Sequence, residues 1–204
     1  TQDPKTRRGI DVKIMQTKYP KAHSYLFRFE KLLRSRSGLR RYFSEDDPIW
    51  SIFNVGEYTF APWKVVWRGE VATSLVAAVV ESDRSGKVII PDQTVYFVPF
   101  ESKKAAYYLC GVLNSAPVRS LYRAFAYKHV SMDFVQGIGI PDFSTTNTIH
   151  SKLAELSEAA HKATASGDTA EVKRIEDEVD RVAAQLWDLT AEELSEIRAS
   201  LEEA

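Results

Sequence analysis

Apolar residues recur every three or four positions over residues 20–37, which predicts an amphipathic helix. Pro20 suits the first turn of this helix, and Gly38 suits a position just beyond its end. Lysine and arginine fall opposite the apolar stripe, so the helix would bury one side and present positive charge on the other. Residues 1–19 show no such period, and we predict an irregular basic arm there.

Residues 49–100 change to a pattern that is typical of strands. β-branched and aromatic residues dominate several stretches, and glycine and proline separate them. Residues 71–82 fit a strand or a helix, and their many β-branched side chains favour a strand. We therefore predict strands in residues 49–55, 64–67, 71–82 and 87–100, with a turn over 82–87.

Helical patterns return after residue 102. Ser102 is placed to cap one helix, and Pro117 to open a second helix after a short break. Residues 130–143 are predicted to form a loop and a short strand. The tail then reads as a helical hairpin that turns at Gly167, with Asp168 as the cap of its second helix, and a last helix starting at Thr190.

These elements predict an α+β fold: a strand-rich domain of mixed or antiparallel strands with packed helices, followed by a C-terminal helical hairpin. Charge divides the chain in a similar way. Residues 1–44 carry 12 basic and 3 acidic residues, a net of +9, whereas residues 45–145 carry 9 and 11, a net of −2. Residues 146–204 carry 6 and 14, a net of −8. We predict three parts: a basic arm and linker helix (1–44), an α+β domain (45–145) and an acidic helical tail (146–204).

The composition is that of an ordinary soluble globular protein, with 44% hydrophobic and 27% charged residues among 204. No apolar run reaches the length of a membrane span, and no signal-peptide pattern is present. The single cysteine, Cys110, excludes an internal disulfide and suits a reducing cytoplasm, where we expect the protein. The chain begins at Thr1 without methionine, and we expect it to be a piece of a longer protein.

Few residues of the sequence form a pattern that suggests catalysis or metal binding. Asp92, Glu101 and Lys103 match a loose pattern of metal-dependent nucleases. However, nine residues of strand would hold the two carboxylates about 30 Å apart, too far to share an ion. His150 and His161 would lie about 16 Å apart on one helix, so we predict two surface histidines rather than a metal site. We predict a packing role for Cys110, no catalytic residue and no metal site.

Aromatic residues are prominent in the middle of the chain. Trp63-Lys64 and Trp67-Arg68 each join a ring to a cation, which suits a nucleic-acid-binding surface. The alternative is that these residues simply alternate between the two sides of a half-buried strand. Most aromatics of a mixed sheet are core residues. We predict core positions for Phe53, Phe60, Phe97 and Phe100.

Four phrases occur in a characteristic order: SIFNVGEYTFAPWKVVW, IPDQTVYFVPF, AAYYLCGVLNSAPVR and GIGIPDF. Together they resemble the C-terminal, TaqI-like specificity region of bacterial N6-adenine DNA methyltransferases from restriction-modification and phage-defence systems. The preceding YPKAHSYLFRFEKLLRSRSG is similar to the segment that joins the catalytic domain to that region. The resemblance extends over roughly residues 18–190.

The resemblance implies a parent enzyme whose N-terminal domain binds S-adenosylmethionine and flips an adenine out of the duplex. Because the motifs of that domain do not occur here, we expect this fragment to hold no cofactor and to perform no catalysis alone. Its implied partners are double-stranded DNA and the methyltransferase domain of the same parent chain, and no membrane. The candidate DNA-binding residues are Arg34, Arg36, Arg40, Arg41, Trp63, Lys64, Arg68, Lys128 and His129.

Three alternatives to the DNA-binding interpretation remain at this point. Arg40 and Arg41 could neutralise the neighbouring acidic residues 45–47 instead of binding phosphate. The whole chain could also be a protein–protein interaction module that docks through its helical tail, since a net charge of −8 would repel a duplex. The metal-dependent nuclease is the weakest of the hypotheses.

Overall fold

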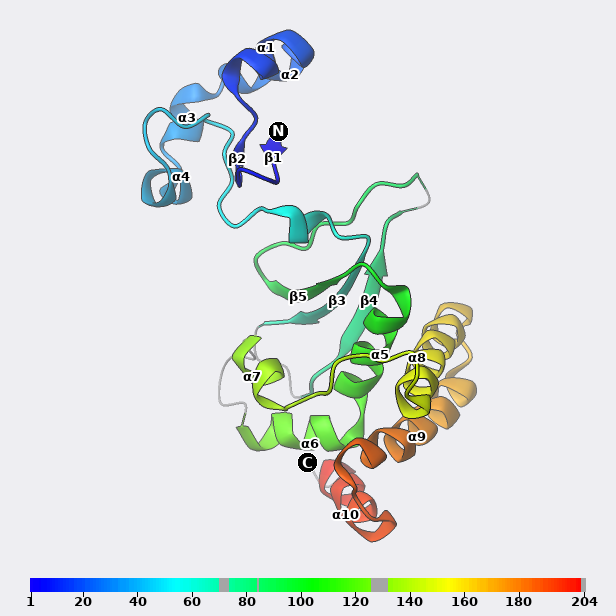
Figure 1. Ribbon diagram of the computed structural model, residues 1–204. Helices are drawn as coiled ribbons and strands as arrows, with labels where there is room; N and C mark the ends of the chain where they lie inside the picture. Colours follow the sequence, from blue (N-terminus) through cyan, green and yellow to red (C-terminus); the bar gives the residue numbers. More distant parts are fainter. Residues whose placement is uncertain (70–73, 84, 126–131, 203–204) are drawn as a thin grey trace. The chain divides into compact units, whose positions relative to one another are not determined.

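The computed structural model describes residues 1–69, 74–83, 85–125 and 132–202. The chain divides into two compact units, Thr1–Ala61 and Pro62–Ala204 (Figure 1). The described residues contain helices and two small antiparallel sheets, which confirms the α+β class. The division by charge into 1–44, 45–145 and 146–204 stays a prediction.

Short helices dominate the first unit. Its elements are β1 (Gln2–Asp3), β2 (Arg8–Gly9), α1 (Val12–Lys18), α2 (Pro20–Phe27), α3 (Glu30–Arg34), α4 (Ser37–Tyr42) and the 3₁₀ turn η1 (Glu57–Phe60). The prediction of an irregular arm over residues 1–19 is therefore wrong. Asp11 caps α1, because its side chain accepts hydrogen bonds from the backbone N–H groups of Lys13 (2.9 Å) and Ile14 (3.2 Å).

The single helix predicted over residues 20–37 is divided into α2, α3 and the start of α4, and Gly38 lies inside a helix instead of ending one. Arg36, between α3 and α4, explains the second break. Its Nη2 donates to the carbonyl oxygens of Ile49 (2.7 Å) and Ser51 (3.0 Å). Short helices are marginal alone, so such tertiary contacts decide where they end.

A small core holds the first unit together. Met15, Ile49 and Trp50 are buried, and Leu26 and Leu33 pack against them. The indole Nε1 of Trp50 donates to the carbonyl oxygen of Ile10 at 2.9 Å. Residues 49–55 form no strand, contrary to the prediction, because their side chains and carbonyl groups are bound by segments far away in the sequence.

The second unit contains the larger sheet. Within the described residues it has three antiparallel strands in the order β4 (Ala77–Glu81), β3 (Trp63–Arg68), β5 (Val95–Phe100). The central residue Val65 pairs with Val79 on one side and Val98 on the other. The strands predicted at 64–67 and in the second half of 87–100 are confirmed, whereas residues 87–94 form none. Of the ambiguous stretch 71–82, residues 77–81 form a strand and residues 71–73 lie outside the described ranges.

The turn predicted after β4 is confirmed. Gly86 donates its N–H to the carbonyl oxygen of Asp83 at 2.8 Å and has a φ of +77°. Glycine adopts this left-handed backbone without the steric cost that a Cβ would add.

Helices cover one side of this sheet and extend away from it (Figure 1). They are α5 (Lys103–Asn114), α6 (Ala116–Phe125), α7 (Met132–Gly137), α8 (Thr148–Ser166), α9 (Thr169–Ala184), the 3₁₀ turn η2 (Gln185–Trp187) and α10 (Ala191–Glu202). α5 packs against all three strands and also against α8, and it buries Ala106, Cys110, Val112 and Leu113 completely. The packing role predicted for Cys110 is thus confirmed. Of the loop and short strand predicted over residues 130–143, residues 132–137 form α7, and residues 138–143 are irregular and form no strand.

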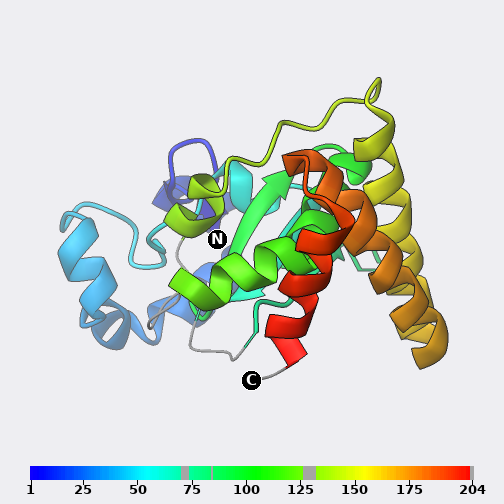
Figure 2. The ribbon, with the colours of Figure 1, turned by 90° about the horizontal axis from the view of Figure 1, so that it is seen from below.

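The predicted helical hairpin is present as α8 and α9, which lie side by side (Figure 2). Gly167 ends α8 with a φ of +76°, and Asp168 caps α9 by accepting the N–H of Glu171 at 3.0 Å. Thr190 and Glu193 exchange side-chain to backbone hydrogen bonds at the start of α10. These signals are local, which is why the sequence indicates them correctly.

Candidate nucleic-acid interface

Two of the predicted arginines line one hollow of the first unit. The hollow has a volume of about 680 Å³ and is lined by Arg34, Leu39, Arg40, Phe43, Ser44, Glu45 and Asp46. Arg34 donates from Nε to the carboxylate of Glu30 at 3.0 Å and from Nη1 to the carbonyl oxygen of Glu45 at 3.3 Å. Arg40 is exposed and forms no ion pair with any described residue. The hollow therefore offers the anchored guanidinium of Arg34 and the exposed guanidinium of Arg40, which has no ion-pair partner among the described residues.

Arg41 follows Arg40 in the sequence and contacts an exposed pair of stacked rings. Its guanidinium lies 5.3 Å from the ring centre of Tyr42, and the Tyr42 ring stacks on Phe53 with a centroid distance of 3.6 Å and an interplanar angle of 13°. Tyr42 is 44% exposed and Phe53 is 50% exposed. The core position predicted for Phe53 is wrong, and so is that for Phe60, because neither residue lies in a strand.

Arg36 has its donors occupied within the unit. Besides the two carbonyl groups already described, its Nε donates to the carbonyl oxygen of Leu33 at 3.1 Å. The residue is half-buried and ties the end of α3 to the segment that carries Trp50. The structure thus gives Arg36 a role in the fold.

One of the acidic residues near these arginines, Asp47, has another partner. The carboxylate of Asp47 is buried and accepts hydrogen bonds from Arg8 and from the backbone N–H of Ser44 (2.8 Å). Burial raises the pKa of Asp47, but the bonds from Ser44 and Arg8 outweigh it and hold this pKa below its usual range. Within the described residues, no ion pair joins Arg40 or Arg41 to residues 45–47, so these carboxylates do not neutralise the two arginines directly.

The aromatic–cation pairs of β3 separate across the sheet. Trp67 is buried, and its ring stacks on Tyr96 at 6.2 Å, whereas Trp63 is half-buried with Lys103 Nζ 5.5 Å from its ring centre. Lys64 points to the opposite side of the strand and is only 1% exposed, and burial lowers the pKa of its ammonium group. Arg68, at the end of β3, is exposed. The burial of Trp67 therefore follows from the alternation of side chains on a half-buried strand, which was the alternative to a nucleic-acid-binding surface.

Two further candidates, Lys128 and His129, lie outside the described residues.

The two units differ in charge. Residues 1–61 carry 12 basic and 7 acidic side chains, a net of +5, and residues 62–204 carry 15 and 21, a net of −6. The exposed arginines 34, 40 and 41 belong to the positive unit.

The nuclease hypothesis finds no site in the described part of the chain. The carboxylate of Asp92 accepts hydrogen bonds from the N–H and the hydroxyl group of Thr94 at 2.8 and 2.6 Å, and Lys103 pairs with Glu158 at 2.9 Å. β5 separates Asp92 from Glu101. No group of three His, Cys, Asp or Glu side chains in the described ranges could hold a metal ion.

The two histidines are structural, and their prediction as surface residues is wrong. His150 is buried, and its Nδ1 accepts the backbone N–H of Ser144 at 3.1 Å. His161 is half-buried and accepts the backbone N–H of Val79 at 3.0 Å. The bond of His161 reaches β4, which is far away in the sequence, and the bond of His150 reaches back to the segment before α8. The spacing of the two histidines along one helix does not reveal either bond.

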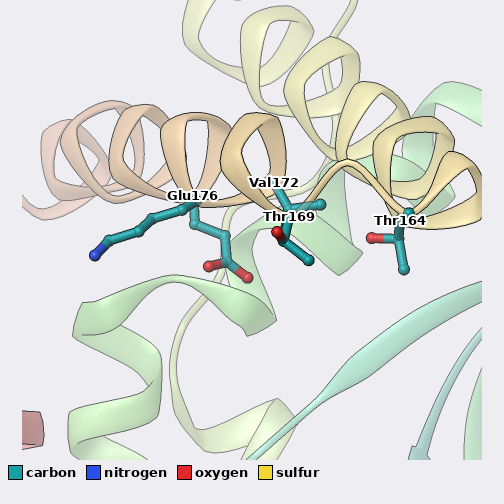
Figure 3. A pocket seen from close by; sticks show the side chains of 6 residues that line it. Thr164, Thr169, Val172 and Glu176 are labelled. Atoms are coloured by element: carbon teal, nitrogen blue, oxygen red, sulfur yellow. The ribbon is translucent and has the colours of Figure 1, made fainter.

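A second hollow of about 350 Å³ lies at the turn of the α8–α9 hairpin. It is lined by Thr164, Gly167, Thr169, Val172, Lys173 and Glu176. The labelled side chains follow the hairpin in a row instead of converging on one point (Figure 3). This arrangement provides no group positioned for catalysis.

No model of a known protein family matches this chain. It is 34% identical over 111 residues to the Type II methyltransferase M.NspV from Nostoc sp. (strain ATCC 29411 / PCC 7524). The match covers 53% of this chain but only 22% of that relative, so the two proteins are related over about a fifth of the relative's length. Part of this chain is therefore related to a Type II methyltransferase. None of the described helices is both long and apolar enough to cross a membrane.

Proposed function

We propose that this chain is the DNA target-recognition part of an adenine-specific methyltransferase of a restriction-modification system. The observation that carries the proposal is the partial similarity to a Type II methyltransferase. Because the match covers only 22% of that protein, it fits one part of such an enzyme and not the whole enzyme. In the proposed enzyme, a catalytic domain outside residues 1–204 binds S-adenosylmethionine and methylates the flipped adenine. The present chain binds the duplex and positions it.

Exposed arginines supply the phosphate contacts in this proposal, three from the first unit and one from the second. Arg34, Arg40 and Arg41 are exposed on a unit of net charge +5, and Arg68 is exposed at the end of β3. Guanidinium groups bind phosphate oxygens with two donors, which sets the position of the protein on DNA. Arg36 and Lys64 support the fold, because the donors of Arg36 are occupied and Lys64 is buried.

A salt titration of DNA binding tests the proposal. We expect the logarithm of the association constant to fall with the logarithm of salt concentration with a slope of about −3 to −4 for four phosphate contacts. The double variant Arg40→Ala/Arg41→Ala should reduce the slope by about 2, because each lost contact no longer releases a counterion. Fluorescence anisotropy with a labelled duplex measures both quantities.

The control is Lys173→Ala/Arg181→Ala, which removes two exposed cations from the acidic tail and should leave the slope unchanged. Absence of DNA binding at low salt, even with a catalytic domain present, would contradict the proposal. That result would favour the alternative of an interaction module, which the net charge of −8 over residues 146–204 suits.

A further inference from the structure

The closest pair of rings in the described part of the chain is also exposed. Tyr42 ends α4 and Phe53 lies in the irregular segment after the buried Trp50, and their rings are nearly parallel at 3.6 Å. In the same unit the exposed rings of Tyr25 and Phe29 meet edge to face at 5.4 Å and 64°, and exposed Phe27 lies at 5.3 Å and 27° from the ring of His23. The stack therefore presents a flat aromatic face at the surface rather than closing a core.

The stack has room for one more ring. Tyr42 is the one described ring in contact with Phe53, and half of the Phe53 side chain remains exposed. A planar group placed on the outer side of Phe53 would continue the stack that Tyr42 begins. At a centroid distance of 3.6 Å the rings of Tyr42 and Phe53 lie face to face, closer than the offset-parallel pairs that aromatic rings generally prefer. A nucleobase has a face of similar size on which such a ring can stack.

One arginine lies against this aromatic pair, and a second precedes it in the sequence. Arg41 lies over Tyr42 at 5.3 Å, and Arg40, one residue earlier, forms no ion pair with a described residue. Aromatic platforms beside arginines bind unpaired bases, because the ring stacks on the base and the cation binds the phosphate. Arginine and aromatic residues are also common at protein–protein interfaces. The net charge of +5 on the first unit is what favours a nucleic acid over a protein partner.

We propose that the Tyr42–Phe53 stack binds an unpaired nucleobase of DNA. This inference rests on the proposed function and deepens it. A duplex offers no free base face along its length, whereas an enzyme that flips one base leaves its partner base unpaired. Phe53 stacks on such a base, Tyr42 supports Phe53, and Arg41 and Arg40 hold the adjoining phosphates.

The test compares two labelled duplexes of equal length, one fully paired and one with a single unpaired base. We expect the chain to bind the second duplex about tenfold more tightly, as base–aromatic stacking provides. Phe53→Leu should abolish this preference and leave the affinity for the paired duplex unchanged. Phe53→Trp keeps a flat ring and should retain the preference.

Phe29→Leu is the matched control, because Phe29 is 42% exposed in the same unit but belongs to an edge-to-face pair. This variant should retain the preference. Circular dichroism of each variant checks that the fold persists, as expected for an exposed side chain.

The outcomes separate the two proposals. If neither duplex binds, the proposed function and this inference both fail. If the paired duplex binds but wild type shows no preference, or Phe53→Leu retains it, only the inference fails. If Phe53→Leu instead changes the sedimentation mass of the protein and not its base preference, the stack belongs to a protein contact and the inference is overturned.

Discussion

The side-chain amide of Asn114 binds both backbone groups of Ala77. The N–H of Ala77 donates to Oδ1 and Nδ2 donates to the carbonyl oxygen of Ala77, each at 2.8 Å. Two residues further along β4, the N–H of Val79 donates to Nε2 of His161. β4 is an edge strand of the described sheet, so side chains from α5 and α8 occupy the positions that a neighbouring strand would otherwise use.

Asn114→Ala should lower the free energy of unfolding by about 2 kcal/mol, because it leaves the N–H of Ala77 without its partner and the carbonyl oxygen of Ala77 with only the Cys110 thiol at 3.4 Å. Urea denaturation followed by circular dichroism measures this change. Gln93→Ala, an exposed position, serves as the control and should change stability by less than about 0.5 kcal/mol. Equal stability of the two variants would show that Asn114 does not support the edge.

His150 should make stability depend on pH. Burial lowers the pKa of its imidazole in the folded state, so the unfolded chain binds this proton more readily. The stabilisation is complete above the unfolded pKa of about 6.5 and decreases as pH falls below it. Urea unfolding at a series of pH values between about 5 and 8 measures the slope. His150→Gln should reduce the slope, and an unchanged slope would exclude His150 as its source.

Cys110 should resist thiol reagents in the folded protein. Burial raises the pKa of its thiol to about 12, and the thiolate is the reactive form. At about pH 8, we expect modification to be on the order of a thousandfold slower than in the unfolded chain. The release of a chromogenic thiol with and without urea measures both rates. Equal rates would show that α5 opens readily.

Asp180 should be essential for the packing of three helices. Its Oδ1 accepts the N–H of Ala116 at the start of α6 at 2.7 Å, and its Oδ2 accepts Nε of Arg198 on α10 at 2.9 Å. Because Asp180 is buried on α9, Asp180→Ala leaves both donors unsatisfied and should cost about 3 kcal/mol in the free energy of unfolding.

The matched control for Asp180 is Glu192→Ala, an exposed carboxylate on α10 that should be nearly neutral. Arg198→Ala should cost less than Asp180→Ala, because the N–H of Ala116 keeps its partner. A larger loss for Arg198→Ala would contradict this assignment.

The sequence alone determined most of the helical part of this protein. Ser102, Gly167, Asp168 and Thr190 act on backbone groups within a few residues, so the ends of α5, α8, α9 and α10 follow from local pattern. The β-branched and aromatic composition of β3 and β5 also indicated their positions, and the structure shows alternate residues of both strands in one core.

Tertiary structure alone decided the features that govern the candidate interface. Residues 49–55 have the composition of a strand, yet Arg36 and Ile10 bind this segment across long stretches of chain, which leaves Phe53 on the surface. Lys64 is buried although its sequence suits a phosphate contact. Local propensity contributes fractions of a kcal/mol per residue, whereas burial and long-range hydrogen bonds contribute more, so they determine which cations and rings remain exposed.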